Sequence, residues 1–433
     1  MTRPINADLP AAKPSGESLP KPQRRQRKPV PAALKAIAGL FALAVVFVVA
    51  AILGGGASDD EPTRGTAPGP ISGIAEAPAE QDSAPTAEEL GYPAFATSNT
   101  TRVGGSDPAS NAAGIALAAY PSTDEAQRPA AVTLIEPGDW RSAIAAAVLM
   151  AEPLGAPLLV AEASGIPEPT SQALGALDPQ GSPDSRGVEA FAVGAASIPA
   201  GLEATRVKAV GGAATAAAIA GLRDRLFGAP PRHIVVVPAT EPAFAMPAAA
   251  WAARSGDPVL FAGPGKLPAK TAATLRRHPK TPVYVLGPSS AISSDVVREI
   301  AAIGNRVRRV SGEDPVANAI ALARYADGDF GWNVNDPGHG FVVVRADSPL
   351  DAAAAAPLSA SGTWGPLLLT EGADTLPVGL RGYLLDVKPG YTINPTRAFY
   401  NHVWVIGDED AIDVSQQAEI DELAELARIG GEP

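Results

Sequence analysis

The sequence predicts an α/β protein made of three tandem small modules with parallel sheets, preceded by one N-terminal transmembrane helix. Three observations predict this fold class. Short runs rich in Val, Leu and Ile alternate with helical segments, which is typical of buried parallel strands in βαβ units. The order and spacing of these runs recur three times in residues 99–433. A charge-free apolar stretch near the N-terminus is long enough to cross a bilayer.

The N-terminal residues predict a basic cytoplasmic tail, 1–31, and a membrane span, 32–53. Residues 1–35 hold eight Lys or Arg and two acidic residues, a net charge of +6. The charge-free run 36–53 would measure about 27 Å as a helix. Because the basic residues precede the span and acidic residues follow it, the positive-inside rule places the bulk of the chain outside the cytoplasm. A cleaved signal peptide is the alternative, although its apolar region is usually shorter.

Residues 54–98 predict a disordered tether. They are rich in Pro, Ala, Gly and acidic residues and show no hydrophobic period. A flexible coil of this length reaches about 35–40 Å on average, so the domain that follows could stand off the membrane.

Three similar starts divide the remaining chain into modules. Gly105, Gly212 and Gly312 mark these starts at intervals of 107 and 100 residues. Each glycine follows a basic residue and a Val, and an Ala-rich amphipathic run comes after it. We call the predicted modules copy one (99–206), copy two (207–306) and copy three (307–433).

Each copy then carries three apolar runs in the same order. The first runs are VTLIEP at 132, IVVVPA at 234 and FVVVRA at 341. The second runs lie behind Pro157, Pro258 and Pro366, which follow the first runs by 25, 24 and 25 residues. The third runs end at Gly194, Gly287 and Gly407. Each copy therefore predicts a small sandwich with three buried strands. Among the helices, 267–278 shows an apolar side, and Ser293 and Asp413 occupy N-cap positions.

Composition excludes several classes of function. The chain has no Cys, so thiolate catalysis, disulfides and Cys-based metal sites are excluded. Its net charge of −12 argues against a nucleic-acid partner, because phosphate binding needs a basic footprint. Aromatic residues make up only 5% of the chain, which argues against a large cleft that stacks sugars.

No catalytic or cofactor motif is convincing. The four histidines, His233, His278, His339 and His402, lack metal-ligand spacing, so we expect no metal. No GxSxG elbow is present. The glycine pairs resemble a dinucleotide fingerprint only loosely, because no clear strand pattern precedes them. We therefore expect no cofactor and no enzyme activity.

Taken together, these motifs resemble the cell-wall-binding repeat type 2 family. Copy three matches most positions of its pattern: Arg309, Gly312, Asp314, Pro349, Asp351, Pro357, Leu358, Leu367, Leu368 and Gly407. Copy one keeps Arg102, Gly105 and Asp107 but has Ser142 at the acidic position. Copy two departs further, with Ala209 beside Lys208 at the Arg position and Phe244 at the acidic one.

The resemblance implies a fold and a function. Modules of this family pack in threes around a pseudo-threefold axis and hold proteins noncovalently to anionic cell-wall polymers. It implies that Asp351 caps a helix whose alanines lie close against the sheet or a sister module. The expected partners are an anionic wall polymer, or a peptidoglycan-associated glycan, and the lipid bilayer through residues 32–53.

The expected polymer contacts are one basic residue per copy and nearby acidic residues: Arg102, Lys208, Arg309, Asp107, Asp314 and Asp351. Arginine suits phosphate or carboxylate groups because its planar fork donates paired hydrogen bonds. Three weak sites on one body would raise avidity. The competing interpretation of the basic residues is pairing with an acid such as Asp107 or Glu313.

Two other classes of function stay open. One is a structural or regulatory scaffold that contacts a protein partner. The other is an envelope hydrolase that uses Asp347 and Asp351 as its acid and base.

Overall fold

The computed structural model describes residues 95–208 and 210–430, which lie within one compact unit of the chain, Glu76–Pro433. The predicted tail (1–31), membrane span (32–53) and nearly all of the predicted tether fall outside the described residues. Within the described ranges, none of the helices is both long and apolar enough to cross a membrane.

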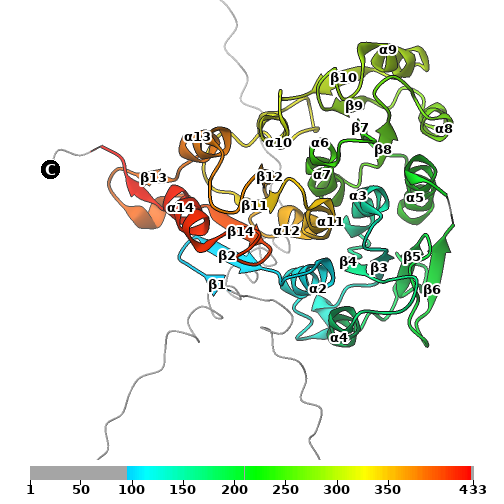
Figure 1. Cartoon of the computed structure of the whole chain (residues 1–433), viewed down its shortest axis with the longest axis horizontal. Coiled ribbons are helices and arrows are strands. Elements are labelled where there is room, and N and C mark those ends of the chain that lie inside the picture. Colours follow the sequence, from blue (N-terminus) through cyan, green and yellow to red (C-terminus); the bar gives the residue numbers. More distant parts are fainter. Residues whose placement is uncertain (1–94, 209, 431–433) are drawn as a thin grey trace, which may run out of the picture. The chain divides into compact units, whose positions relative to one another are not determined.

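Three small sheets of mainly parallel strands form the framework, which confirms the predicted α/β class (Figure 1). The first sheet has the order β4 (Leu158–Val160), β3 (Val132–Ile135), β5 (Ala190–Val193), β6 (Ala204–Val207). The second has the order β8 (Val259–Ala262), β7 (Ile234–Pro238), β9 (Val283–Leu286), β10 (Val307–Val310). The third has the order β12 (Leu367–Thr370), β11 (Gly340–Arg345), β14 (His402–Ile406), β2 (Thr100–Val103), β1 (Phe95–Ala96).

The nine strands predicted from the apolar runs are all present, and the pairing register repeats. Val235 pairs with Val259, Thr133 with Leu158 and Val342 with Leu367. Most of these strands are fully buried because helices cover both faces of a parallel sheet. Their Val, Leu and Ile side chains supply most of the core.

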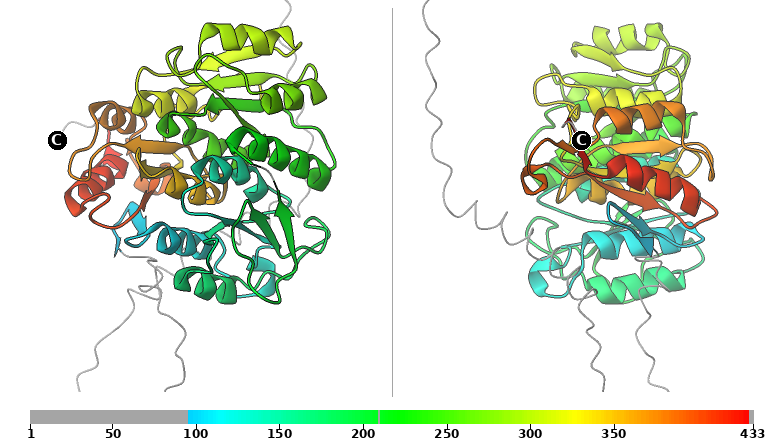
Figure 2. Two further views of the ribbon diagram at one scale, coloured as in Figure 1. Left: turned by 45° about the vertical axis from the view of Figure 1, so that its right-hand side comes forward. Right: turned by 90° about the vertical axis from the view of Figure 1, so that its left-hand side faces the viewer.

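The strand that opens each copy pairs with the sheet of the preceding copy; in copy two this strand begins at Ala204, three residues before the predicted boundary at 207. β6 joins β5, β10 joins β9, and β2 of copy one joins β14 of copy three. Figures 1 and 2 show β2, near the start of the described chain, beside β14, near its end. The first copy thus completes the sheet of the last one and closes the arrangement into a ring.

The expectation that no strand precedes the glycine pairs was therefore wrong. β6 and β10 lie at sheet edges and are only partly buried, so they do not need the continuous apolar run by which buried strands are recognised. Their sequences, ATRV and VRRV, place arginines where a buried strand would have Val or Leu.

Helices cover the sheets of each copy. Copy one contributes α2 (Pro108–Ala119), α3 (Trp140–Ala146), α4 (Glu168–Leu177) and the 3-10 turns η1 (Glu125–Gln127) and η2 (Ala147–Met150). Copy two contributes α5 (Gly212–Phe227), α6 (Pro242–Ala245), α7 (Pro247–Ser255), α8 (Ala269–Arg277) and α9 (Ser294–Ala302). Copy three contributes α10 (Pro315–Arg324), α11 (Pro349–Ala354), α12 (Ala356–Ala360), α13 (Val378–Asp386), η3 (Pro395–Arg397) and α14 (Val414–Ala424). A short ladder joins β13 (Gly390–Tyr391) to β15 (Ala427–Arg428).

Several predicted helix features are confirmed. The helix expected at 267–278 is α8, which buries Ala272 and Leu275 and exposes Lys270. Ser293 caps α9 by accepting a hydrogen bond from the Val296 amide, and Asp413 caps α14 in the same way.

Alanine-rich helices from the three copies meet each other. α3 contacts α11, and α7 contacts α12 (Figure 1). The 3-10 turn η2 also contacts α7. Buried alanines fill these contacts: Ala143, Ala145, Ala146 and Ala147 in copy one, Ala248, Ala249 and Ala250 in copy two, and Ala352 to Ala356 in copy three. Such small side chains let helix backbones approach closely. Contact between equivalent helices of all three copies is what packing about a pseudo-threefold axis requires.

Candidate functional site

We call the interface between two neighbouring copies a seam. Arg102 is buried at the seam between copies one and three, where β2 pairs with β14. Its side chain in β2 is 1% exposed. It donates hydrogen bonds to Gln417 Oε1 at 3.0 Å and to the carbonyl oxygens of Gly407 at 2.9 Å, Asp408 at 2.7 Å and Ile412 at 2.6 Å. Burial lowers the pKa of Arg102, and the charges of Glu409, Asp408 and Asp413 oppose that shift. The guanidinium therefore joins β2 to the turn that follows β14.

The same contact recurs in the other two sheets. Arg309 in β10 donates to the carbonyls of Gly287 at 2.5 Å and Ile292 at 2.6 Å. Arg206 in β6 donates to the carbonyls of Gly194 at 2.7 Å and Ala196 at 2.9 Å. In every sheet the arginine of the opening strand thus binds the glycine that ends the third strand. The geometry gives these residues a structural role, and polymer contact by Arg102 and Arg309 stays a prediction.

Arg206, rather than Lys208, is the copy-two counterpart of Arg102 and Arg309. Lys208 lies two residues beyond it and is exposed to solvent. The tripeptide Thr-Arg-Val at both 101–103 and 205–207 was the signal that could have identified Arg206. An alignment of the copies on their glycine pairs does not bring Arg206 opposite Arg102 and Arg309, because copy two has more residues between the strand and the glycine pair.

Asp107 and Asp314 are exposed N-cap residues. Asp107 Oδ1 accepts hydrogen bonds from the amides of Ala109 at 2.8 Å and Ser110 at 3.0 Å, at the start of α2. Asp314 accepts from the Ala317 amide at 2.7 Å and starts α10. Helix capping accounts for the presence of an aspartate at both positions, and both residues remain exposed to solvent.

Asp351 does not cap a helix, which corrects the expectation for this residue. α11 begins at Pro349 after Ser348, so Asp351 lies inside the first turn. Among the described residues its Oδ1 atom has no hydrogen-bond partner. Burial raises the pKa of Asp351 to about 6, helped by the nearby charges of Asp107, Asp347 and Asp408, while the side chain of Asn111 in α2 opposes the shift. The carboxyl thus faces the seam between copies three and one.

Asp347, the other carboxylate of the hydrolase alternative, is held by Arg345. The two side chains form a bidentate ion pair, in which Arg345 Nε lies 2.9 Å from Asp347 Oδ1. Burial acts to raise the pKa of Asp347, but the pair with Arg345 outweighs it and lowers the pKa. Neither Asp347 nor Asp351 lines the two cavities described next.

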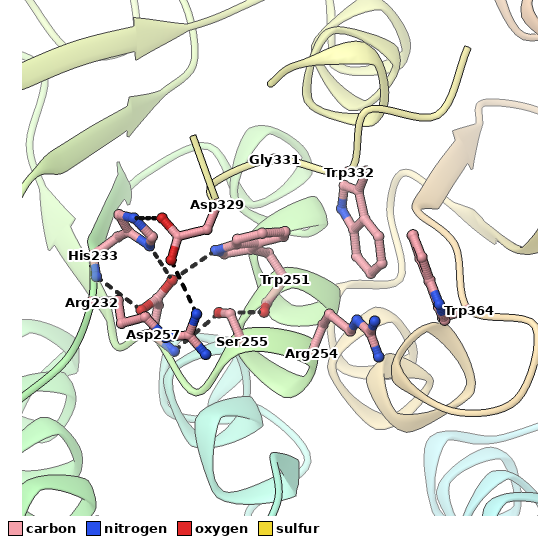
Figure 3. Close-up of a pocket in the computed structure, with 10 residues that line it drawn as sticks. All are labelled: Arg232, His233, Trp251, Arg254, Ser255, Asp257, Asp329, Gly331, Trp332 and Trp364. Carbon is pink, nitrogen blue, oxygen red and sulfur yellow. Dashed lines mark hydrogen bonds and ion pairs between the residues drawn. The ribbon is translucent and has the colours of Figure 1, made fainter. Parts of the chain in front are cut away.

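A cavity of about 290 Å³ lies between copies two and three (Figure 3). Residues of copy two that line it are Arg232, His233, Trp251, Arg254, Ser255 and Asp257. Residues of copy three that line it are Asp329, Gly331, Trp332 and Trp364. Asp329, Gly331 and Trp332 belong to the segment 325–339, which joins α10 to β11 and is the longest of the three equivalent connections.

A buried polar network forms one side of this cavity (Figure 3). Asp257 is 1% exposed and accepts hydrogen bonds from the His233 amide at 3.0 Å, His233 Nδ1 at 3.0 Å and Trp251 Nε1 at 3.1 Å. His233 Nε2 lies 3.1 Å from Asp329 Oδ1. Burial acts to lower the pKa of His233, but the two carboxylates outweigh it and raise the pKa.

Aromatic rings and Arg254 form the other side. The rings of Trp251 and Trp332 are edge to face at 5.7 Å, and those of Trp332 and Trp364 are stacked at 6.1 Å. The Arg254 guanidinium lies 4.6 Å above the Trp364 ring and donates to the Ala360 carbonyl at 3.3 Å. The low aromatic content did not reveal this cluster, because residues far apart in the sequence meet only in the tertiary structure.

A second, open cavity of about 450 Å³ lies at the carboxyl ends of β3 and β4 in copy one. Its polar lining includes Glu136, Asp139, Glu162 and Ser164. Glu136 accepts from the Ala195 amide at 3.2 Å, and Asp139 caps α3. Within the described ranges, no group of three or more acidic or histidine side chains is arranged to hold a metal ion. This acidic lining suits an anionic ligand poorly.

Comparison with known proteins adds to this picture. Residues 204–297 and 309–417 match the family described as "Cell wall binding domain 2 (CWB2)". The matched stretches fall in copies two and three. No curated protein matches the chain.

Two solved structures from Clostridium difficile share the fold. Cwp6 superposes with a TM-score of 0.61 at 19% identity, covering 76% of this chain and 48% of that one. Cwp8 superposes with a TM-score of 0.57 at 18% identity, covering 76% of this chain and 52% of that one. The chain thus spans about half the length of the solved structures it matches. Residues 204–297 and 309–417 are thus similar to the cell wall binding domain 2 family, and the fold is similar to that of Cwp6 and Cwp8.

Proposed function

We propose that this protein is a noncatalytic component of the cell envelope that binds an anionic cell-wall polymer from the outer side of the membrane. The match of copies two and three to a family of cell-wall-binding domains is the observation that carries the proposal. The basic tail and apolar span in the sequence support a membrane tether through residues 32–53. A tethered domain already lies at high local concentration beside the wall, so weak contacts are sufficient.

Surface residues are the better candidates for polymer contact. Lys208 is exposed, and the N-cap carboxylates of Asp107 and Asp314 face solvent. Arg102 has four protein acceptors, so its contribution to binding would be to hold the seam between copies in shape. Asp351 supports the same seam from α11.

Retention on isolated cell walls tests the proposal. The purified full-length chain is mixed with walls before and after chemical removal of their anionic polymers. We expect retention on intact walls and its loss on stripped walls. Equal retention on both would reject an anionic polymer as the ligand.

A scaffold that contacts a protein partner is the second candidate, and one observation favours it. Among the described residues, eight large hydrophobic side chains are exposed, and seven of them lie in copy three: Val378, Leu385, Ile393, Phe399, Tyr400, Val414 and Ile429. Exposed apolar surface of this kind is typical of contact between proteins. Cross-linking in intact cells that joins these residues to another protein, together with failure to bind walls, would favour the scaffold.

A further inference from the structure

We propose that the cavity between copies two and three binds one acidic monosaccharide unit, with its carboxylate or phosphate group against Arg254. The inference rests on the proposed function and deepens it, because it assigns a site and a ligand class to the polymer. It does not depend on the arginines that recur at the seams.

The volume and position of the cavity fit a small ligand. Ligand pockets usually measure about 300–1,000 Å³, so 290 Å³ suits a single sugar-sized group. Its walls come from two copies: α7 on one side and the segment 325–339 with Trp364 on the other. A polymer that crosses the seam could place one residue here while its neighbours stay outside.

Arg254 is the one cation of this lining without a carboxylate partner among the described residues. Arg232 pairs with Asp329 at 3.0 Å, and His233 lies between Asp257 and Asp329. Within residues 95–208 and 210–430 Arg254 forms no ion pair: it donates to the Ala360 carbonyl, and the charge of Glu152 acts on it without direct contact. Trp364 covers the guanidinium on one side and withdraws it partly from water. An anion there would recover charge-assisted hydrogen bonds.

Residues of the same lining also carry neutral donors. The indole N–H groups of Trp332 and Trp364 donate no hydrogen bond to any described residue, whereas that of Trp251 is bound to Asp257. Sugar hydroxyl and ring oxygens accept such hydrogen bonds. The exposed carboxylate of Asp329 can in turn accept hydrogen bonds from sugar hydroxyls. The lining therefore offers a cation, free donors and one acceptor, which together match an acidic sugar.

The other two copies show that the fold does not require these side chains. The equivalent strand registers align His233 with Ala131 and Gly340. Counting back from the proline before the second strand aligns Asp257 with Ala156 and Gly365, and Arg254 with Pro153 and Gly362. Copies one and three form the same sheets with small or nonpolar residues at these positions. The polar set is thus specific to copy two, and folding alone does not explain it.

The segment 325–339 gives the cavity a fixed wall. Phe330 stacks on Tyr284 of β9 with ring centroids 3.5 Å apart. Asp327 pairs with Arg306 at 2.6 Å and with Arg308 at 2.8 Å. Contacts on both sides of Asp329 therefore hold it and Trp332 in position before a ligand arrives, which reduces the entropy lost on binding.

Titration of the full-length chain with small sugars tests the inference directly. The probes are glucuronate, glucose 6-phosphate, glucose and inorganic phosphate. Binding is measured by calorimetry and by tryptophan fluorescence, because three of the five tryptophans line the cavity. We expect at least one acidic sugar to bind about tenfold or more tightly than glucose and phosphate. Equal binding of glucose and both acidic sugars, or no binding by any probe, would overturn the inference.

Three variants locate the binding. Arg254→Gln should weaken the acidic sugar about tenfold or more, and Trp332→Phe, which keeps a ring but removes the N–H group, should weaken it several-fold. Arg276→Gln is the matched control, because Arg276 is an exposed arginine in the last turn of α8 in the same copy. It should bind as the unchanged chain does. Unchanged affinity in Arg254→Gln, with an unchanged melting temperature, would rule out the site.

Wall retention of the same proteins separates this inference from the proposed function. If the unchanged chain is retained on walls but binds no acidic sugar, the site is wrong and the proposed function stands. If the unchanged chain binds an acidic sugar through Arg254 but is not retained on walls, the site stands and wall binding fails.

Discussion

At the scale of single residues, the charged groups at the seams serve mainly to join one copy to the next. Arg102, Arg206 and Arg309 each bind the carbonyl oxygen of a glycine that ends a neighbouring strand. In the sequence, a basic residue in each of the three copies suggested three weak ligand sites. The same repetition follows equally from a structural contact that every copy needs.

Arg102→Ala should destabilise the protein by about 3 kcal/mol or more, because it leaves several buried carbonyl oxygens without a donor. Chemical denaturation of the full-length chain measures the loss. Arg276→Ala, at an exposed position, should change the free energy of unfolding by less than about 0.5 kcal/mol. Similar values for the two variants would contradict a structural role for Arg102.

Asp351 predicts a pH dependence. Its pKa in the folded protein, about 6, lies above the unfolded value of 3.8, so the folded state holds a proton that the unfolded state has released. Stability from this group is therefore present at low pH and is lost as the pH rises from about 4 to about 6, at most about 3 kcal/mol in total.

Asp351→Asn should remove this slope and raise the melting temperature at pH 7.5, because no buried carboxylate has to ionise. Thermal unfolding between pH 4 and pH 8 measures both effects. Asp410→Asn, at an exposed carboxylate, is the control and should leave the slope unchanged. A destabilised Asp351→Asn variant at pH 7.5 would show that the charged form makes favourable contacts.

At the scale of elements, the alanine-rich helices explain why copy three carries so much small surface. Ala352 to Ala356 are buried where α11 and α12 meet α3 and α7. Larger side chains would hold the helix backbones apart. The stretch from Ala352 to Pro357 thus supplies packing surface between copies.

Ala353→Leu should destabilise the protein by about 1–3 kcal/mol or more, because the added carbons have no space between packed helices. Ala301→Leu is the matched control, since Ala301 is exposed near the end of α9. Denaturation curves of both variants make the comparison. Equal tolerance of leucine at both positions would mean that the central helices are loosely packed.

At the scale of the whole molecule, strand exchange makes the three copies depend on each other. β2 lies between β1 and β14, so copy one supplies part of the sheet of copy three. Cut at the predicted boundaries, 99–206 keeps β2 and 307–433 keeps β10, although each of these strands belongs to the sheet of a neighbouring copy. It stays a prediction that the chain divides into modules at 99–206, 207–306 and 307–433.

A shortened chain tests this dependence. Removal of residues 1–105 deletes β1 and β2 and leaves the edge of β14 unpaired. We expect it to lose more stability than Arg102→Ala does, and to aggregate through the exposed edge. Removal of residues 1–94 keeps both strands and should leave the unfolding curve unchanged. Equal stability of the two shortened chains would show that β2 is dispensable.

The sequence by itself determined the fold class, the nine buried strands and several helix starts. These features depend on local patterns: apolar runs, their spacing and capping residues such as Ser293 and Asp413. A buried strand must be apolar along its whole length, so its signal is strong. The resemblance to cell-wall-binding repeats came from the same local patterns and agrees with the family match.

Only the tertiary structure decided which sheet each edge strand joins, and which residues share a site. Edge strands such as β6 and β10 carry arginines and lack an apolar run, so local pattern does not reveal them. The cavity between copies two and three collects Trp251, Asp329 and Trp364 from separate segments. Their meeting depends on how the copies pack, and that packing follows from the whole set of contacts rather than from any single stretch of sequence.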